Sequence, residues 1–243
     1  LFDHFNLTIP DKQFVCVVGS NGSGKTSLLN IICGSIPIED GAIVIGGKNI
    51  TSMPEHKRLR RIGRVYQDPA RGTCPSMTIL ENMSMADNKG KPFNLMPCVN
   101  RKKTEEYRAM LAQLGLGLED RMTSKVGLLS GGQRQALTLL MATLVTPKLL
   151  LLDEHTAALD PATAEKVLEL TKQIVADNHI TCLMITHNIP SALALGNKTI
   201  MMNNGSIVME LAGQERSTMT TEKLLHKFHE QGMSNDRILF SAE

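Results

Sequence analysis

Short apolar runs alternate with amphipathic stretches in the first third of the chain. The run Gln13–Gly19 is apolar and ends in glycine, which predicts a buried strand. The stretch Lys25–Cys33 repeats leucine and isoleucine at helical spacing, and Gly34 supplies its stop, so it predicts a helix. Two further apolar runs favour strands, Gly41–Ile45 and Ile62–Gln67.

The pattern becomes mostly helical from Pro75 to about Val145. Three stretches in it carry apolar residues at helical spacing: Thr78–Ala86, Arg101–Leu114 and Gly132–Leu144. The segment Asp87–Pro97, between the first two, is rich in Lys, Gly, Pro and Asn and predicts a surface loop.

Strand patterns return in the second half of the chain. The runs Leu149–Asp153 and Thr181–Thr186 predict strands, and Asp160 followed by Pro161 predicts the start of a helix between them. Strand–helix alternation on both sides of a helical middle predicts a parallel α/β core with a helical insertion.

The end of the chain combines a hairpin and a polar tail. Asn204-Gly205 is a strong hairpin signal, and it lies between the apolar runs Lys198–Asn203 and Ser206–Leu211. The tail that follows, residues 217–243, carries one expected helix at Thr221–His229.

Composition narrows the class of protein. A length of 243 residues, 42% hydrophobic and 21% charged, suits one large domain with an insertion. The longest apolar stretches fall short of the about 20 residues of a membrane span, and residues 1–10 are too polar for a secretory signal. A net charge of +2 lacks the basic excess of a protein held by nucleic-acid phosphates. The five cysteines form no CxxC pair, which argues against a disulfide framework or a zinc site and favours a reducing compartment.

The strongest chemical signal is a phosphate loop, defined here as Gly19-Ser20-Asn21-Gly22-Ser23-Gly24-Lys25-Thr26. Its glycines let backbone N–H groups approach a polyphosphate, and the helix that follows points its positive end at the same oxygens. Lys25 can reach the β- and γ-phosphates, and the Thr26 hydroxyl can bind Mg²⁺. An ordinary glycine-rich turn is the alternative, which the strand before and the helix after disfavour.

The second signal is a buried strand that ends in two acids, Asp153 and Glu154. The carboxyl edge of a parallel sheet is where α/β proteins bind ligands. We expect Asp153 to hold Mg²⁺ through water and Glu154 to polarise the attacking water. Alone this pattern is weak, because many strands end in Asp, but it gains weight beside a phosphate loop.

The third signal is a signature turn, defined here as Leu129-Ser130-Gly131-Gly132-Gln133, at the start of a predicted helix. Serine and two glycines at a helix N-terminus offer a second anion site. A head-to-tail dimer, in which this turn closes over the partner's γ-phosphate, explains two such sites for one nucleotide. A capped helix start would also account for these residues.

Together the three motifs resemble the nucleotide-binding subunit of ATP-binding cassette (ABC) transporters of the bacterial stand-alone type, over nearly the whole chain. The resemblance implies a P-loop NTPase with a RecA-like core, a parallel sheet, a small antiparallel β part and an α-helical insertion subdomain. It implies a single domain, with the ATP-binding core at 1–75 and 146–216, the helical subdomain at 76–145 and the C-terminal tail at 217–243.

The resemblance also assigns roles to single residues. Gln67 matches a glutamine that senses Mg²⁺ and the attacking water, His187 matches a histidine that contacts the γ-phosphate, and Asp160 ends a segment that crosses the dimer interface. Taken singly, Gln67 and His187 would be plain loop residues; their positions just after predicted core strands favour the assigned roles. The implied catalytic set is Glu154, His187, Gln67 and Lys25. The implied nucleotide contacts are the phosphate loop with Ser27, then Ser130, Gly131, Gly132, Gln133 and Asp160, and the implied Mg²⁺ ligands are Thr26, Gln67 and Asp153.

Three departures from the family pattern stand out. His155 and Ala157 replace the usual Pro and Ser, which predicts the loss of a side-chain contact across the dimer interface. Alanines such as Ala136 and Ala142 stand where arginines are common after the signature turn. The aromatic that stacks on adenine is expected before residue 1, together with a missing N-terminal strand, and Phe2 and Phe5 are expected to belong to an early strand.

The resemblance implies an ATPase that forms a dimer with a second copy of itself beneath membrane permease subunits, at the cytoplasmic face of the membrane. Import of amino acids or similar solutes, with an extracytoplasmic solute-binding protein and no nucleic acid, is the favoured interpretation. An ABC exporter ATPase would share every motif, and a non-transport ABC ATPase acting on nucleic acid or ribosomes is the other alternative. The basic run from Lys57 to Arg64 is expected to be a solvated surface.

Overall fold

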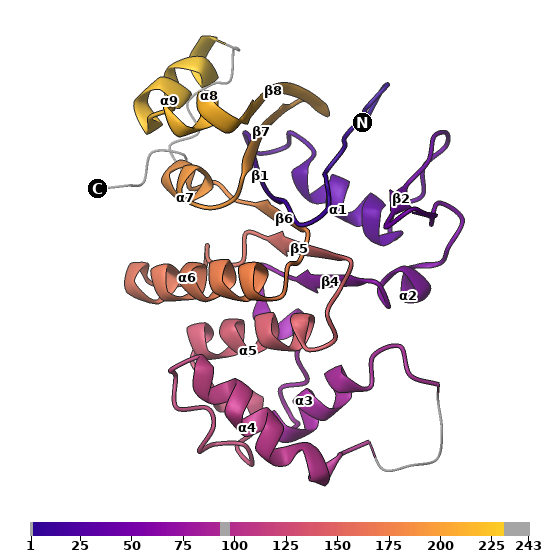
Figure 1. The fold of residues 1–243 in the computed structure, drawn as a ribbon, viewed down its shortest axis with the longest axis vertical. Coiled ribbons are helices and arrows are strands. Elements are labelled where there is room, and N and C mark those ends of the chain that lie inside the picture. Colours follow the sequence, from indigo (N-terminus) through magenta and orange to yellow (C-terminus); the bar gives the residue numbers. More distant parts are fainter. Residues whose placement is uncertain (1, 93–97, 231–243) are drawn as a thin grey trace.

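The computed structural model describes residues 2–92 and 98–230 and centres on a six-stranded sheet in the order β4-β5-β6-β1-β7-β8 (Figure 1). Pairing is parallel from β4 to β7, and β8 pairs antiparallel with β7. The strands are β1 (Phe14–Val18), β4 (Ile62–Val65), β5 (Leu149–Asp153), β6 (Cys182–Ile185), β7 (Lys198–Asn203) and β8 (Ser206–Ala212). The expected α/β class and parallel core are confirmed.

The two faces of the sheet bury alternate residues of each strand. On one face Val15 and Val17 pack with Leu28 and Leu29 of α1 (Lys25–Cys33). On the other face the intervening residues pack against α5 (Gly131–Thr143), α6 (Pro161–Asp177) and α7 (Ile189–Ala194). Because both faces are covered, the central strands are continuous apolar runs, as the sequence indicated.

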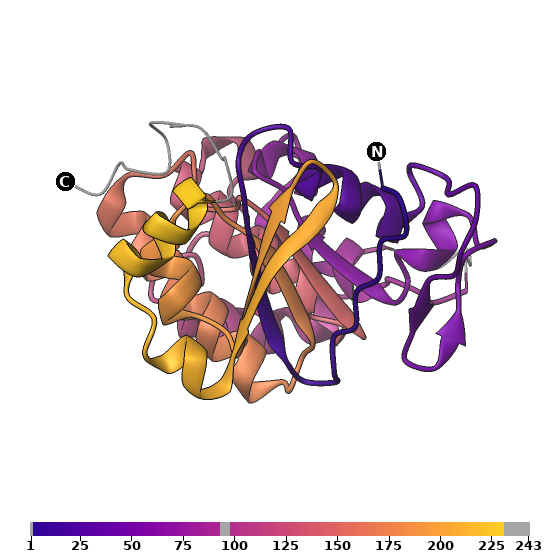
Figure 2. The ribbon, with the colours of Figure 1, turned by 90° about the horizontal axis from the view of Figure 1, so that it is seen from above.

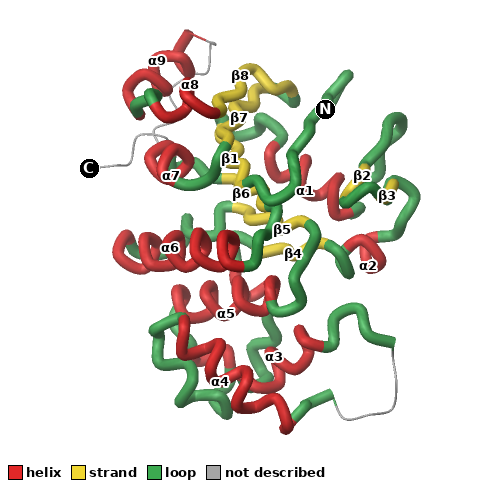
Figure 3. Tube along the Cα trace, in the orientation of Figure 1, coloured by secondary structure: helices red, strands yellow, loops and turns green. Residues whose placement is uncertain are grey.

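Helices α3 (Ile79–Asp87), α4 (Thr104–Gln113) and α5 gather at one end of the molecule, where Figure 3 shows no strand. Their shared core includes the fully buried Met83, Tyr107 and Leu111. A short 3-10 turn, η1 (Pro69–Gly72), lies between β4 and α3, and two others, η2 (Arg101–Lys103) and η3 (Val126–Leu128), lie between successive helices of this group. The three predicted helices are confirmed, and part of the predicted loop at Asp87–Pro97 lies outside the described residues.

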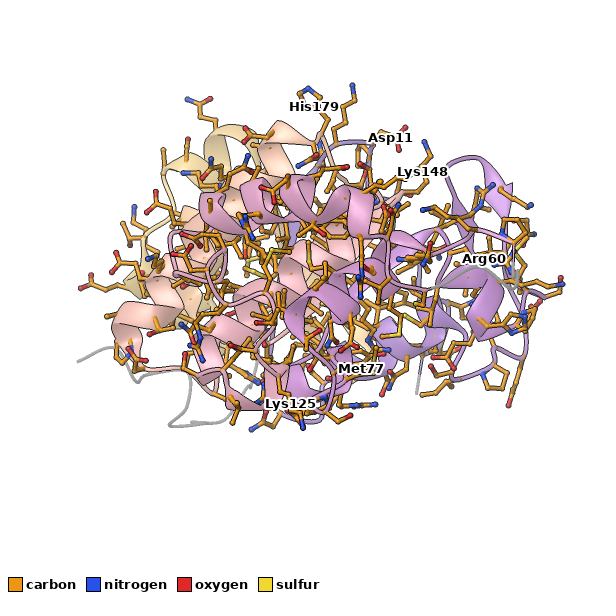
Figure 4. All side chains as sticks on the ribbon, turned by 90° about the horizontal axis from the view of Figure 1, so that it is seen from below. Asp11, Arg60, Met77, Lys125, Lys148 and His179 are labelled. Carbon is orange, nitrogen blue, oxygen red and sulfur yellow. The ribbon has the colours of Figure 1, made fainter. Side chains whose placement is uncertain are left out.

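A small antiparallel pair, β2 (Val44–Ile45) with β3 (Lys48–Asn49), forms the expected antiparallel part, although β2 is shorter than the predicted strand. Beside it, α2 (Glu55–Arg58) carries part of the basic run. The prediction of a solvated run is wrong for Arg58 and Arg64. Arg58 is 4% exposed and donates hydrogen bonds to the carbonyl oxygens of Met53, Ile31, Ile32 and Thr51. Arg60, labelled in Figure 4, is exposed as expected.

The N-terminal segment contradicts one expectation. Residues 2–13 form no strand, and Phe2 and Phe5 instead stack edge to face with ring centroids 5.0 Å apart. Seen from above, this segment runs beside the β7–β8 hairpin (Figure 2), where Phe5 lines a cavity with Ser206 and Ile207. The aromatic rings fill apolar space against the core, which replaces the strand pairing that their β-propensity suggested.

The C-terminal part contains the predicted hairpin and helix. Asn204 and Gly205 both have positive φ, 46° and 76°, as a two-residue hairpin turn requires. The helices α8 (Gly213–Ser217) and α9 (Thr221–Glu230) follow, and Leu224 of α9 is buried. Within 2–92 and 98–230, no helix has the length and apolar character needed to cross a membrane.

Candidate functional site

Four parallel strands end at one edge of the sheet and bring the predicted site residues to it. The phosphate loop follows β1, Glu154 follows β5, His187 follows β6 and Gln67 follows β4. The registers align these ends, since Ile185 is opposite both Val17 and Asp153. Parallel pairing alone therefore gathers motifs that are far apart in the sequence.

The phosphate loop is held in place by its neighbours. The backbone N–H of Gly205 donates to the Ser23 carbonyl at 3.0 Å, so the hairpin turn braces the loop. A Cβ at Gly19 would lie 2.3 Å from the Met202 carbonyl oxygen, so only glycine fits there. Gly24 has φ 100° and stands at the N-cap of α1, where it offers no side-chain hydrogen bond to the first turn.

Lys25 turns back onto the loop it belongs to. Its Nζ donates to the carbonyl oxygens of Gly19 and Ser20, both at 2.8 Å, and lies 3.4 Å from the Ser23 hydroxyl. The residue is 5% exposed, so this charge is balanced by carbonyl dipoles in a partly enclosed position. An anion in the loop would offer Lys25 a stronger, charge-assisted partner.

A hydroxyl and a carboxylate meet beside the loop. Thr26 Oγ1 donates to Asp153 Oδ1 at 3.3 Å, and Arg64 Nη2 lies 3.4 Å from Asp153 Oδ2. Burial raises the pKa of Asp153, while Arg64 and the Thr26 hydroxyl act against that rise. Asp153 is therefore a buried carboxylate with one hydroxyl and one cation as partners.

These donors fit a magnesium ion. Mg²⁺ prefers oxygen ligands and takes one or two protein groups together with water and phosphate oxygens. Thr26 and Asp153 supply two such oxygens next to the phosphate loop. Within the described parts of the chain, no group of three or more His, Cys, Asp or Glu residues could hold a metal ion.

Glu154 and His187 form a close pair. His187 Nε2 lies 2.5 Å from Glu154 Oε1, and their side chains are 17% and 15% exposed. Glu154 has φ 47°, a left-handed conformation that is rare for a residue with a side chain, and its N–H donates to the Ile185 carbonyl at 3.1 Å. The ends of β5 and β6 thus hold the Glu154 carboxylate against the His187 imidazole, at the same sheet edge as the phosphate loop. This arrangement is suited to accepting a proton from water.

Gln67 lies two residues beyond β4 and is exposed. The preceding Tyr66 is tied to α5, because the buried Gln135 donates from Nε2 to the Tyr66 carbonyl oxygen at 3.2 Å. The glutamine segment is therefore connected to the helix that begins at the signature turn. Sequence reasoning missed Gln135; a polar residue amid the apolar stripe of that helix was the available signal.

The signature turn is a capped helix start. Ser130 Oγ accepts from the Gln133 N–H at 3.3 Å, and Gln133 Oε1 accepts from the Ser130 N–H at 3.2 Å. Ser130 and Gly131 are exposed, whereas Gly132 is buried against α6, where a Cβ would lie 2.0 Å from Thr163 Cγ2. The capping alternative is confirmed, and the anion role stays a prediction.

Asp160 caps α6 beside the signature turn. Its Oδ1 accepts from the Thr163 N–H at 3.0 Å, and hydrogen bonds from Thr163 lower the pKa of Asp160. The starts of α5 and α6 thus lie side by side. Neither start belongs to the strand ends that carry Lys25 and Glu154.

His155 packs inside its own subunit. It is 2% exposed, and its Nε2 lies 3.0 Å from Thr171 Oγ1, which itself donates to the Val167 carbonyl oxygen. Burial lowers the pKa of His155 to about 4, so the ring is neutral near pH 7. The histidine that replaces the usual proline therefore anchors the segment after Glu154 to α6.

Comparison with known proteins places this geometry. The sequence model described as "ABC transporter" matches residues 2–157. A tyrosine transport ATP-binding protein from Clostridioides difficile is 47% identical over 228 residues, which cover 94% of this chain and 90% of that protein. A bicarbonate transport ATP-binding protein from Synechocystis is 36% identical over 208 residues, or 84% of this chain and 68% of the relative. A dimeric ATP-binding cassette, solved in a post-hydrolysis state with ADP and Pi, superposes with a TM-score of 0.72 at 28% identity, covering 87% of this chain and 90% of that one.

Proposed function

Because the chain belongs to the ABC transporter family and is an ATPase of that family, we propose that it powers import of an amino acid or a similar small solute through a separate membrane permease. One observation carries the catalytic part: the Glu154–His187 pair, 2.5 Å apart, stands at the sheet edge that holds the phosphate loop. The relative named for tyrosine transport supports the solute class, and relatives named for import of methionine and of phosphonates support the direction.

The phosphate loop, with Ser27, would bind the nucleotide phosphates through its backbone N–H groups and the uncapped start of α1. Lys25 would exchange its bonds to the Gly19 and Ser20 carbonyls for the β- and γ-phosphates. Nucleotide binding would therefore require the Lys25 side chain to move away from the loop carbonyls, without forming a new strand or helix.

Thr26, Asp153 and Gln67 would hold Mg²⁺. The Thr26 hydroxyl and the Asp153 carboxylate already lie 3.3 Å apart, and the exposed Gln67 adds an amide oxygen from the end of β4. When bound, Mg²⁺ would neutralise charge on the phosphate oxygens.

Glu154 would accept a proton from the attacking water, and His187 would hold the carboxylate in place and contact the γ-phosphate. The contact between His187 Nε2 and Glu154 Oε1 would fix the direction of the carboxylate toward the attacking water. Catalysis would then rest on positioning and on charge stabilisation, which is typical of phosphoryl transfer.

A second copy would complete each nucleotide site. In a head-to-tail dimer, Ser130, Gly131, Gly132 and Gln133 of one protomer would face the γ-phosphate held by the other, with Asp160 at the interface. Exposure of Ser130 and Gly131 supports this arrangement, and the dimeric cassette of similar fold was solved with ADP and Pi.

The permease would dock between the sheet and the helical end, near Gln67 and Thr78–Met83, from the cytoplasmic face of the membrane. Asn82 is fully buried and binds the Cys74 backbone through both its amide oxygen and its amide nitrogen, so this stretch has a defined shape. An extracytoplasmic solute-binding protein would deliver the solute to the permease.

Co-expression with a candidate membrane permease from the same organism tests the proposal. The complex in vesicles is expected to take up labelled tyrosine only with ATP on the side of this chain, and Glu154→Gln is expected to abolish uptake. ATP-dependent export, or ATP hydrolysis that no permease stimulates, would contradict the proposed function.

A further inference from the structure

Arg64 is a buried cation whose guanidinium contacts the proposed metal site. Its side chain is 5% exposed. Nη2 donates to Asn30 Oδ1 at 2.8 Å and lies 3.4 Å from Asp153 Oδ2, while Nε is buried without a hydrogen-bond partner. The guanidinium carbon lies 4.6 Å from the centre of the Tyr66 ring. Asn30 and Tyr66 thus hold the Arg64 guanidinium in place beside the Asp153 carboxylate.

The two oxygens of Asp153 have different partners. Oδ1 accepts from the Thr26 hydroxyl at the phosphate loop, and Oδ2 faces Arg64. A guanidinium stays protonated at any pH a protein experiences, so this positive charge is permanent. In a buried setting its repulsion of a second cation is much stronger than in water.

We propose that Arg64 is a built-in counter-cation of Asp153, which keeps divalent metal off the nucleotide-free protein so that metal binds only together with nucleotide phosphates. This inference rests on the proposed metal site at Thr26 and Asp153. The negative phosphates would supply the charge that outweighs the guanidinium. Arg64 acts as a positioning residue, because it acts on the proposed metal site through the Asp153 carboxylate that it contacts.

Binding of Mn²⁺ to the nucleotide-free protein, followed by electron paramagnetic resonance, tests the inference without any turnover. Arg64→Gln and Arg64→Met are expected to bind Mn²⁺ about tenfold more tightly than the wild type, because a buried repulsive charge is removed. Adding Asp153→Asn to either variant should abolish the gain. Equal Mn²⁺ affinity in wild type and folded Arg64 variants would overturn the inference.

Arg71 provides a matched control. Its guanidinium also lies 4.6 Å from the Tyr66 ring, but the residue is exposed and, within the described parts of the chain, forms no hydrogen bond or ion pair with Asp153. Arg71→Gln removes the same charge from the same ring and should leave Mn²⁺ affinity within about twofold of the wild type, because an exposed charge is screened. A gain as large as that of Arg64→Gln would show a general charge effect and overturn the assignment to Arg64.

Asn30→Asp is a second route if the Arg64 variants fail to fold. It places a carboxylate at the 2.8 Å partner of Nη2 and should draw the guanidinium from Asp153, so nucleotide-free Mn²⁺ binding should strengthen. Unchanged binding would overturn the inference. A separate measurement with ADP present tests the proposed metal site at Thr26 and Asp153. If Asp153→Asn then binds Mn²⁺ as tightly as the wild type, the proposed metal site is wrong. If Asp153→Asn binds Mn²⁺ more weakly, the metal site stands and the Arg64 variants test the inference.

Discussion

The phosphate loop and the signature turn are both glycine-rich helix starts, yet the structure treats them in opposite ways. The first has a partly buried loop: Ser23 is 1% exposed and Lys25 closes onto the loop carbonyls, while Asn21 and Gly22 are exposed. Its helix start has no side-chain cap. The second is exposed and capped by its own Ser130 and Gln133, and Leu128 just before it is 72% exposed.

The difference shows which turn can bind a ligand alone. Uncapped N–H groups beside a lysine make an anion site within one chain. A capped, outward-facing turn needs a ligand presented from outside, which is how the proposed dimer would use it. The following predictions test that contrast, from the largest effect to the smallest.

Glu154→Gln should have the largest effect, and it falls on the side of the phosphate loop. If Glu154 is the proposed proton acceptor, loss of its carboxylate should lower ATP hydrolysis by about 10³-fold while ATP binding persists. Phosphate release measures ATP hydrolysis, and equilibrium dialysis measures ATP binding. Glu165→Gln, which removes an exposed charge from α6, is the control. Normal turnover in Glu154→Gln would remove Glu154 from its role.

Ser130→Arg should separate the two turns. A bulky cation on the exposed signature turn is expected to abolish ATP-dependent dimerisation of the Glu154→Gln protein, while one chain still binds nucleotide at its phosphate loop. Light scattering during size-exclusion chromatography measures the dimer. Gln214→Arg, on the exposed helix α8, adds the same charge elsewhere and should dimerise. A dimer that forms equally well with Ser130→Arg would refute the head-to-tail arrangement.

Alanine at one glycine of each turn should reveal their different surroundings. At Gly19 the new Cβ meets the Met202 backbone at 2.3 Å, so about 2–3 kcal/mol of stability and much of the nucleotide affinity should be lost. At Gly132 the new Cβ meets the side-chain atom Thr163 Cγ2, which can move, so the loss of stability should be only about 1 kcal/mol. Urea denaturation gives both values. Thr163→Ser should restore Gly132→Ala, and a failure to do so would contradict the packing account.

The smallest effect concerns His155, in the segment between Glu154 and α6. The pKa of His155 is about 4 in the folded chain against 6.5 for an ordinary histidine, so the unfolded chain takes up a proton first. Stability should therefore be full above about pH 6.5 and decline toward pH 4. His155→Gln should flatten that decline in urea titrations, and His56→Gln, at an exposed position, should not. An equal decline in His155→Gln would mean that other groups cause it.

Much of the fold followed from local patterns. The strand β5, the helix α1 and the hairpin strand β7 have the bounds that periodicity and turn residues indicated. The signals that set such bounds act between neighbours in sequence: Gly34 ends α1, Asp160 caps α6 and the Asn204-Gly205 turn ends β7. Phe2 and Phe5 escaped such reasoning, because their place depends on apolar space that distant segments create.

The site divides in the same way. Spacing identified the phosphate loop, Asp153, Glu154 and the signature turn, because each motif needs only a few consecutive residues. The partners of Arg64 and His155 could not be read this way. Arg64 looked like one member of a solvated basic run, and only the pairing of β4 with β5 buries it against Asp153.

The sequence by itself determined the order of the elements, the α/β class and the chemistry of the two turns, because short-range spacing and periodicity encode them. The tertiary structure decided which charges are buried and which residues meet. It paired Glu154 with His187, neutralised His155 and placed Arg64 beside the Asp153 carboxylate. The physical reason is that desolvation and pairing depend on neighbours from distant parts of the chain, and only the parallel register of the sheet brings those neighbours together.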